Sequence, residues 1–513
     1  MPSFGNQMLR DGEFCGYSYL VRCFCQSSIK PRVTAKVSLS VSRRVEQSGC
    51  ILFPMSSVPP ANDLLGHILF AIRYEGINLQ ILSEMLPRVS EKAMREAIQA
   101  KPNGAYLRKA GYLWELFTER TIADITPAGR YIELFDSDRY FTDPVGVRHS
   151  RWHVIWNGLG TPDWCATVEK TPFLIEKTSE NLLQSAVESL EALSVLKRER
   201  AFEWAYLTET HGSFALERET ISGSRENRFI SLLREIDGNA VLSEDFLCNL
   251  QNEIVGSPYE KASSFRTEQN WLSNGMRGAF GVRYVPPSPE DLPSLAQAWL
   301  KAANTLPKRI DPLVAAAVIS FGFLYLHPFM DGNGRLSRFL IHQQLAASGA
   351  LKEKMLLPVS SAIKKLEDRY FEALIAFSSP SRAFWDVIRT RGETPLTFSF
   401  RGKTSLYRYW DATPQTEFFF SMAYEAFELL KAGLFAFEQF DAVCLAVDQQ
   451  FDIRQHVLHS IVHEVLDQHG VLSAKTRERF ADRVPPDVFE VLEKTAREVL
   501  VESKSDPTLS STD

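Results

Sequence analysis

The sequence has 513 residues, of which 45% are hydrophobic and 23% charged, and its formal net charge is −6. This is globular composition, long enough for about two to four domains, and the acidic balance argues against a dedicated nucleic-acid binder. No apolar run reaches the roughly 18 residues of a membrane span, and the seven cysteines include no CxxC pair, so we expect a protein of the reducing cytoplasm without a disulfide framework.

Residues 1–54 differ in character from the rest of the chain. They carry seven Lys and Arg residues against three acids and lack helical periodicity. They also lack an apolar core followed by a small-residue cleavage site, which argues against a secretory signal. We therefore expect residues 1–54 to be a non-native or disordered extension, with Met55 as the physiological start.

Residues 55–165 read as an N-terminal helical domain. The stretch 61–86 has helical periodicity on both sides of Gly76, which indicates two helices with a break between them. An aromatic, Gly/Pro-rich connector comes next, at 139–165. Residues 179–210 then predict one long helix with Ser179 as its cap.

The region 166–385 is the predicted central domain. Aromatic and β-branched residues around Asn274-Gly275 predict a β-hairpin over 265–285. A helix starts at Asp311-Pro312, because Asp is a favoured N-cap and Pro a favoured first residue. Helices predominate again in a C-terminal domain, 386–501, and the polar tail 502–513 should be disordered. The predicted fold class is mostly α, a helical core with a small β-hairpin, flanked by helical regions.

The central domain contains a dense polar string directly after a buried helix. Residues 313–326 are apolar all round, and Pro328 ends that helix at His327. The string HPFMDGNGRLSR then runs from His327 to Arg338. Gly332 and Gly334 permit close approach to the backbone, and a new helix should begin near Arg335.

This arrangement is typical of phosphate chemistry. Backbone N–H groups at a helix start form an anion-binding nest, and Arg335 and Arg338 can fork phosphate oxygens. Asp331 offers a hard oxygen ligand for Mg²⁺. The ordinary pKa of His327 suits a general base. Together they indicate phosphoryl or nucleotidyl transfer; a purely structural loop is the alternative.

The string resembles the signature of the Fic family, HxFx(D/E)GNGRxxR, at every fixed position. The resemblance implies transfer of AMP from ATP to a hydroxyl of a target protein, with His327 deprotonating that hydroxyl and Asp331 holding Mg²⁺. Phe329 would anchor the loop in the core. It further implies a phosphate cradle and its arginines: Gly332, Asn333 and Gly334, Arg335 on the inner phosphates, and Arg338 on the γ-phosphate. The related Doc kinases carry lysine at the second glycine, so Gly334 argues against phosphate transfer.

Two neighbouring segments resemble further parts of that family. The hairpin near 265–285 is similar to the flap that docks a target strand by β-augmentation, which implies docking by Trp271, Leu272, Ser273, Asn274 and Gly275. The segment HGSFALERE near 205–220 resembles the inhibitory helix, (S/T)xxxE(G/N), with Ser213 and Glu217 at the fixed positions. Arg218 departs from the pattern, which has Gly or Asn there.

The resemblance therefore implies a long bacterial-type Fic protein adenylyltransferase, restrained by Glu217 in the Arg338 site. ATP and Mg²⁺ would be its substrate and metal, and a target protein its partner. Two alternatives stay open: removal of AMP from modified proteins by the same glutamate, and a nucleotide-sensing module whose flanking helices bind protein or DNA. The target, self-modification and homo-oligomer formation are not readable from the sequence.

Overall fold

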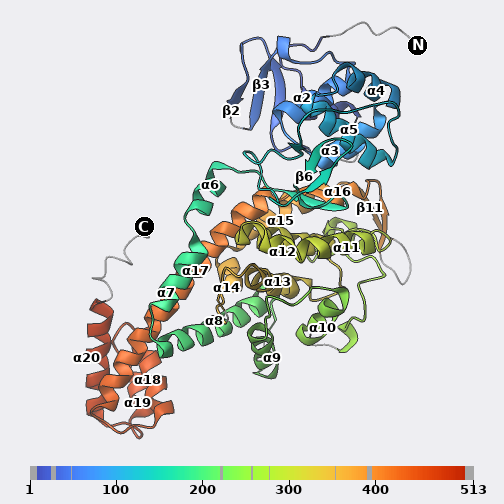
Figure 1. Ribbon diagram of the computed structural model, residues 1–513. Helices are drawn as coiled ribbons and strands as arrows, with labels where there is room; N and C mark the ends of the chain where they lie inside the picture. The colour runs from blue at the N-terminus through green and yellow to red at the C-terminus, as the bar shows by residue number, and fades with distance from the viewer. Residues whose placement is uncertain are drawn as a thin grey trace. The chain divides into compact units, whose positions relative to one another are not determined.

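Figure 1 shows the computed structural model, which describes residues 8–24, 30–47, 49–219, 223–255, 258–276, 278–352, 354–389 and 396–502. The fold is mostly helical with small sheets, as predicted. The chain divides into two compact units: the first holds the described parts of 1–189 and 206–424, the second those of 190–205 and 425–513. The domain boundaries predicted after 165 and 385 both fall inside the first unit. The predicted disordered tail lies, from residue 503 onward, outside the described residues.

The expectation of a disordered extension over 1–54 is wrong for its described residues. They form helix α1 (Gly16–Phe24) and a sheet in which β3 (Cys50–Pro54) pairs parallel with β1 (Thr34–Ser38) and antiparallel with β2 (Val45–Gln47). Alternate strand residues point into a small core, which includes Ala35, Val37, Ile51 and Phe53 with Cys15 and Phe70. This period of two, spread over short strands, escapes a search for helical periodicity. That Met55 is the physiological start stays a prediction.

The region after this sheet contains the two predicted helices and their break. Its helices are α2 (Leu64–Tyr74), α3 (Leu79–Met85), α4 (Glu91–Ala100) and α5 (Ala105–Thr118). Gly76 takes a left-handed φ of 90° between α2 and α3, a conformation that glycine adopts without strain. The aromatic connector forms small strands: β4 (Ile132–Glu133), β5 (Val147–His149), β6 (Val154–Trp156), β7 (Leu159–Thr161) and β8 (Trp164–Thr167). Strand β13 (Tyr409–Asp411) pairs parallel with β8.

The predicted long helix over 179–210 is interrupted. The structure has α6 (Pro172–Ser179), α7 (Leu182–Glu191), α8 (Val195–Leu216) and α9 (Gly223–Arg234). Ser179 ends α6 instead of capping a new helix, and Asn181 adopts a left-handed φ of 50°. Asparagine tolerates this conformation better than most residues, so the apolar periodicity continues across a break that it does not reveal.

The helices that hold the polar string form the centre of the first unit. They are α10 (Glu244–Ile254), α11 (Leu292–Ala303), α12 (Pro312–Leu326), α13 (Asn333–Ser348), α14 (Val359–Lys365) and α15 (Glu367–Arg382). Figure 1 shows α12 between α11, α13 and α15. Its residues are buried on almost all sides, which explains its uniformly apolar sequence.

Two hairpins and several short elements complete the first unit. The hairpins are β9 (Leu272–Ser273) with β10 (Val282–Tyr284), and β11 (Trp385–Arg389) with β12 (Leu396–Phe400). The short elements are α16 (Ser405–Arg408) and the 3₁₀ turns η1 (Met55–Ser57), η2 (Leu86–Arg88), η3 (Pro258–Glu260), η4 (Ala279–Gly281) and η5 (Leu306–Lys308). The hairpin predicted around Asn274-Gly275 is thus present, although its strands are shorter than expected.

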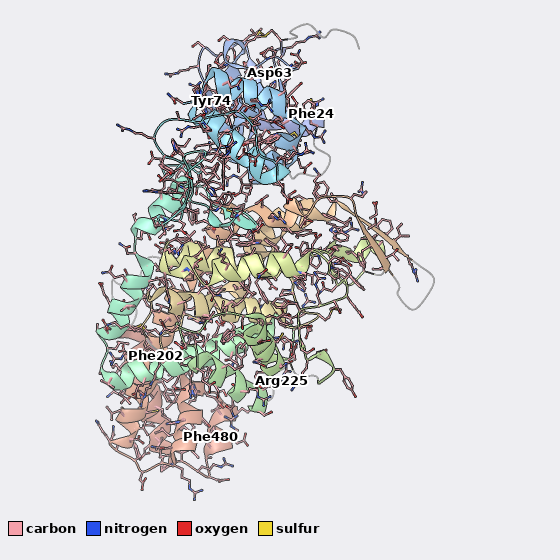
Figure 2. The ribbon with its side chains drawn as sticks, turned by 45° about the vertical axis from the view of Figure 1, so that its right-hand side comes forward. Phe24, Asp63, Tyr74, Phe202, Arg225 and Phe480 are labelled. Atoms are coloured by element: carbon pink, nitrogen blue, oxygen red, sulfur yellow. The ribbon has the colours of Figure 1, made fainter. Side chains whose placement is uncertain are left out.

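The second unit has a separate hydrophobic core. It is built from the end of α17 (Thr413–Asp448) with α18 (Gln455–Asp467), α19 (Ala474–Phe480) and α20 (Pro486–Glu502). Its buried residues include Leu458, Ile461 and Leu492, together with Phe480, which is labelled in Figure 2. Within the described part of the chain, we find no helix both long and apolar enough to cross a lipid bilayer.

Candidate functional site

The site begins where helix α12 ends. Asp311 caps the start of α12 by accepting hydrogen bonds from the amides of Leu313 (2.9 Å) and Val314 (3.0 Å). At the other end, His327 takes a left-handed conformation with φ 49° and ψ 58°. The helix therefore starts and stops where the sequence predicted, and the stop places the His327 ring at the head of the polar string.

The His327 imidazole is held in one orientation. Its Nδ1 lies 3.2 Å from the carbonyl oxygen of Leu324. Because a carbonyl only accepts, Nδ1 carries the proton in the neutral ring and Nε2 keeps a lone pair. Burial lowers the pKa of His327 to about 4, with the Arg266 cation acting in the same direction. At neutral pH the ring is therefore an unprotonated acceptor, as a general base must be.

The loop after His327 is shaped by side chains that bind its backbone. Phe329 is buried, and its N–H and carbonyl are both bound by the amide of Asn333, at 3.1 and 2.8 Å. Asn270 also donates to the Phe329 carbonyl (2.9 Å), and Arg266 donates to the His327 carbonyl (2.9 Å). The Asn333 side chain therefore serves the loop itself. Only its backbone amide is left to line a phosphate cradle.

An anion nest is present at the start of α13. The first helical hydrogen bond runs from Leu336 N–H to the Gly332 carbonyl (3.0 Å), so the amides of Asn333, Gly334 and Arg335 precede it. Gly332 has a left-handed φ of 85°, which allows the sharp entry into the helix. Helix α13 starts two residues earlier than predicted and adds these amides to the nest.

Arg338 is buried and bound by the predicted inhibitory segment. Its guanidinium donates to the hydroxyl of Ser213 (3.1 Å), the carbonyl of Ser213 (2.9 Å) and Oε1 of Glu217 (2.8 Å). A Cβ at Gly334 would lie 2.2 Å from the same Glu217 oxygen. The Glu217 carboxylate thus lies directly over Gly334, in the nest.

Glu217 lies just beyond the helix that was expected to hold it. Helix α8 ends at Leu216, and Arg218 adopts a left-handed φ of 58°. The family pattern has Gly or Asn at the position of Arg218, and these are the residues that adopt this conformation most readily. Arg218, which replaces the Gly or Asn of the family pattern, therefore adopts the left-handed conformation at the cost of backbone strain, and the chain does not take a different path.

A second acid, Glu219, was missed by the sequence analysis. Its carboxylate lies 3.2 Å from the guanidinium of Arg335, and Arg225 (labelled in Figure 2) donates to it at 2.9 Å. Arg335 is buried and also lies 3.4 Å from Asp331. A turn brings Glu219 back to the site, and no helical spacing signals that turn. The only hint in the sequence is the second acid in "LERE".

The β9–β10 hairpin lies beside this loop. Arg266 and Asn270, which precede β9, bind the loop carbonyls described above. The hairpin residues Leu272, Ser273, Asn274 and Gly275 are exposed. The ring of Trp271 instead packs on Phe398 of β12, with 5.1 Å between ring centroids. The exposed tip thus presents backbone and small side chains, while Trp271 anchors the hairpin.

The segment carrying the nest and the hairpin has recognisable relatives. Residues 241–345 match the family model described as the Fic/DOC family. This segment is a Fic/DOC domain. It contains His327, the glycines and both arginines of the string, whereas Ser213, Glu217 and Glu219 precede it.

Curated relatives match more of the chain at low identity. The protein adenylyltransferase Fic of Drosophila yakuba is 25% identical over 243 residues, covering 42% of this chain and 46% of the relative. That of Nematostella vectensis is 24% identical over 184 residues, covering 30% and 40%. The chain thus spans about half the length of the curated relatives it matches. Both of these relatives are animal proteins, so the bacterial character stays a prediction.

Two solved structures are similar to the chain. A Fic domain containing signalling protein from Bacteroides thetaiotaomicron is 17% identical and covers 51% of this chain and 96% of its own, with a TM-score of 0.35. Fic-1 (residues 134–508) from C. elegans is 16% identical and covers 73% and 92%, with a TM-score of 0.30.

Proposed function

We propose that this chain is a protein adenylyltransferase, which transfers AMP from ATP to a Ser, Thr or Tyr hydroxyl of a target protein and releases pyrophosphate. One observation carries the proposal. The unprotonated Nε2 of His327 and the amide nest of α13 belong to one short loop, which also supplies two buried arginines. The name of the curated relatives, protein adenylyltransferase Fic, supports the same activity.

The reaction needs a base beside a phosphate site. The target hydroxyl oxygen attacks the α-phosphorus and forms a new P–O bond, while the bond from that phosphorus to the bridging oxygen of pyrophosphate breaks. His327 takes the hydroxyl proton on Nε2, and the leaving oxygen departs with its electron pair on pyrophosphate. The low pKa of His327 keeps it free to accept that proton over the whole neutral range.

The negative charge of the triphosphate requires fixed donors. The amides of Asn333, Gly334 and Arg335 offer backbone donors at a helix start. Arg338 and Arg335 add guanidinium groups that are held by burial before any ligand arrives. Donors that are already oriented stabilise developing charge without reorganising during the reaction.

Asp331 is the residue that fits a Mg²⁺ ion. Its side chain is 47% exposed at the edge of the nest, and its only side-chain partner among the described residues is Arg335 at 3.4 Å. Mg²⁺ in nucleotide sites is commonly held by one or two carboxylates plus phosphate oxygens, so a single carboxylate here is sufficient. When bound, the ion would neutralise phosphate charge. The chain itself orients Asp331 through the same loop that carries His327.

Autoinhibition results from the position of Glu217. Its carboxylate binds the guanidinium of Arg338 and fills the space above Gly334. An incoming phosphate must therefore displace this carboxylate. A carboxylate and a phosphate offer arginine the same kind of oxygen acceptors. Glu217 thereby acts as an internal competitor for the terminal phosphate.

Glu219 extends this inhibition to the second arginine. It binds Arg335, which the resemblance assigns to the inner phosphates, at 3.2 Å. The segment after α8 therefore covers each of the two arginines with a carboxylate. We expect nucleotide binding to require release of both acids.

The exposed flap is the proposed docking site for the target. An added strand would pair with the backbone of Leu272 and Ser273 and bring its hydroxyl toward His327. Asn274 and Gly275 form the exposed tip, and Gly275 has a left-handed φ of 86° that the turn needs. Trp271 contributes by anchoring the hairpin on Phe398.

A second candidate activity of the same residues is the hydrolytic removal of AMP from a modified protein. Glu217 is close enough to His327 to influence its pKa, in the upward direction. A carboxylate there could orient a water against AMP already attached to a protein, which would then be hydrolysed. Incubating an AMP-modified target without ATP distinguishes this activity, because only the hydrolase releases AMP under that condition.

The deciding experiment measures transfer of label from α-labelled ATP to protein. We expect Glu217→Gly to label itself or a lysate protein more strongly than the unmodified chain. We expect Glu217→Gly combined with His327→Ala to lose about 10²–10⁴-fold of that rate. Glu226→Gln, a carboxylate on α9 paired with exposed His211, is the matched control and should change nothing. ATP binding without any labelling in Glu217→Gly would support a nucleotide-sensing module instead.

A further inference from the structure

A second site is present in the first unit, apart from the Fic/DOC loop. It is a cavity of about 540 Å³ whose walls come from the N-terminal segment, the α2–α3 turn, β8, α15 and β13. Small-molecule sites in proteins are commonly about 300–1,000 Å³. Among its described lining residues, none belongs to 327–338 or to 213–219. The cavity is therefore separate from the proposed adenylyl-transfer site.

Two arginines in the lining of the cavity, Arg32 and Arg139, share one carboxylate. Glu169 accepts hydrogen bonds from both Nε and Nη2 of Arg139, at 3.2 and 2.8 Å, and from Arg32. Arg32 lies 4.0 Å from Asp411. Oδ1 of Asp411 is already bound by the N–H and hydroxyl of Thr413, at 2.9 and 2.6 Å. One carboxylate thus serves two guanidinium groups, each of which has further N–H donors.

Glu75, at the end of α2, adds a neutral acid to the same cavity. Its Oε1 accepts the N–H of Tyr17 at 2.9 Å, and it lies where a Cβ of Gly16 would otherwise be, at 1.7 Å. Burial raises the pKa of Glu75 to about 8. At pH 7 this carboxyl is therefore protonated, and it can donate a hydrogen bond from its O–H group.

The formal charges of the lining leave one positive charge over. Lys30, Arg32 and Arg139 contribute three cations, and Glu169 and Asp411 two anions once Glu75 is neutral. Other lining residues are apolar or aromatic and include Ile77, Leu79, Phe377, Phe384, Tyr409 and Trp410. A ligand that matches the charged and the apolar lining residues carries one negative charge on an apolar body.

We propose that this cavity binds a small organic monoanion, a carboxylate, sulfonate or phosphate diester on a flat apolar body, with the anion held by Arg139 and Arg32. The apolar body lies against Phe377 and Trp410. The O–H group of Glu75 donates a hydrogen bond to an anionic oxygen of the ligand. The site is independent of adenylyl transfer, so it stands or falls without the function proposed above.

The test uses 8-anilinonaphthalene-1-sulfonate, a fluorescent aromatic monoanion, on the full chain. N-phenyl-1-naphthylamine, which has the same rings without the sulfonate, is the neutral comparison. We expect a saturable site that binds the sulfonate at least about 10-fold more tightly than the neutral probe. Equal affinities for the two probes would overturn the charge assignment.

Two matched pairs of variants place the probe in the cavity. Ala376 is exposed on α15 and lines the cavity, whereas Ser379 is exposed on the same helix and does not line it. We expect Ala376→Phe to abolish the saturable site and Ser379→Phe to keep it.

Arg139→Gln should weaken sulfonate binding at least about 10-fold, and Arg139→Lys should partly restore it. Arg43→Gln is the exposed control. Unfolding midpoints of all variants separate lost binding from lost folding. Binding that survives Ala376→Phe would overturn the site.

A pH series tests the part played by Glu75. The groups whose charges act on it are Cys15, Tyr17, Arg44 and Arg139. Sulfonate affinity should fall as pH rises from 7 to 9, because Glu75 then becomes an anion facing an anion. In Glu75→Gln the affinity should stay level over this range. A fall of the same size in Glu75→Gln would overturn the proton-donating role.

Discussion

His327 combines two properties that burial produces together. The ring is 8% exposed, and its Nδ1–H is fixed on the Leu324 carbonyl. The same burial lowers its pKa from the ordinary 6.5 to about 4. Because the imidazole is already neutral well below pH 6, its protonation state does not change near neutral pH. The rate of a reaction that uses it as a base should therefore not change there either.

We expect kcat/KM of the Glu217→Gly variant to stay level from pH 8 to about pH 5 and to fall only below that. The free enzyme's base titrates in this parameter, and the imidazole remains neutral until the pH approaches 4. The ATP affinity of His327→Ala over the same range corrects for protonation of the nucleotide. An acidic limb centred near pH 6.5 would contradict the burial argument.

Arg218 is a strained residue next to the inhibitory acid. Its left-handed φ of 58° costs a non-glycine residue roughly 1–2 kcal/mol. Arg218→Gly should therefore favour the inhibitory conformation and lower basal transfer by about 5-fold, read as the initial rate of self-labelling. Asn181→Gly relieves a left-handed residue elsewhere (φ 50°) and should leave that rate unchanged. An increase in rate for Arg218→Gly would show that the strain is not stored there.

The inhibitory effects of Glu217 and Glu219 should be distinguishable by comparing the affinities for ATP and ADP. Glu217→Gly frees Arg338 alone, so it should tighten ATP binding more than ADP binding. Glu219→Gln frees Arg335, so it should tighten both nucleotides, by up to about 10-fold. Isothermal titration of the two single variants and the double variant measures this. Glu219→Gln with unchanged ADP affinity would remove Glu219 from the inhibition.

At the scale of elements, the amide side chain of Asn333 braces the loop between α12 and α13 from within the loop. Asn333 binds both the N–H and the carbonyl of buried Phe329. Asn333→Ala leaves the Phe329 N–H without its partner, at a cost of about 1–3 kcal/mol for a buried unsatisfied group, whereas the Phe329 carbonyl keeps its bond from Asn270. We expect a lower unfolding midpoint and lower transfer in the Glu217→Gly background. Asn227→Ala, at an exposed position of α9, is the control, and equal stability of the two variants would contradict the bracing role.

The elements also show how far sequence patterns reach. Asp311-Pro312 and Pro328 fixed both ends of α12, because caps and proline act within a few residues. The hairpin turn at Asn274-Gly275 was found for the same reason. The break after Ser179 was missed, because apolar spacing continues through a left-handed Asn181. Glu217 was expected on a helix, but that helix ends at Leu216. The contact of Glu217 with Arg338, which the resemblance implied, is nevertheless present.

At the scale of the whole molecule, the two units have separate cores. Leu458 is fully buried in the second unit, and a buried Leu→Ala change costs about 2–5 kcal/mol. Leu458→Ala should therefore speed amide hydrogen exchange in α18–α20 while α12 keeps its protection. Val471→Ala, at a position 55% exposed, should have little effect. Equal loss of protection in α12 would show that the units unfold together.

The features that sequence reading missed are those assembled from distant segments. The cavity proposed to bind an anion is lined by Arg32, Glu75, Arg139 and Asp411, which come from four parts of the chain. No motif in the sequence around any of them signals a site. Glu219 reaches Arg335 across more than a hundred residues. The loop from His327 to Arg338, in contrast, is local, and its chemistry was legible because all its groups lie within twelve residues.

Gly334 has no side chain, and the space this leaves is filled by an oxygen of Glu217. Any methyl group added there would push the glutamate out and would meet an arriving phosphate in the same place. If the proposed activity holds, substitution at position 334 therefore cannot give constant activity, because a side chain that displaces Glu217 also fills the space proposed for the phosphate. Control of the enzyme must be adjusted from the glutamate's side of the contact.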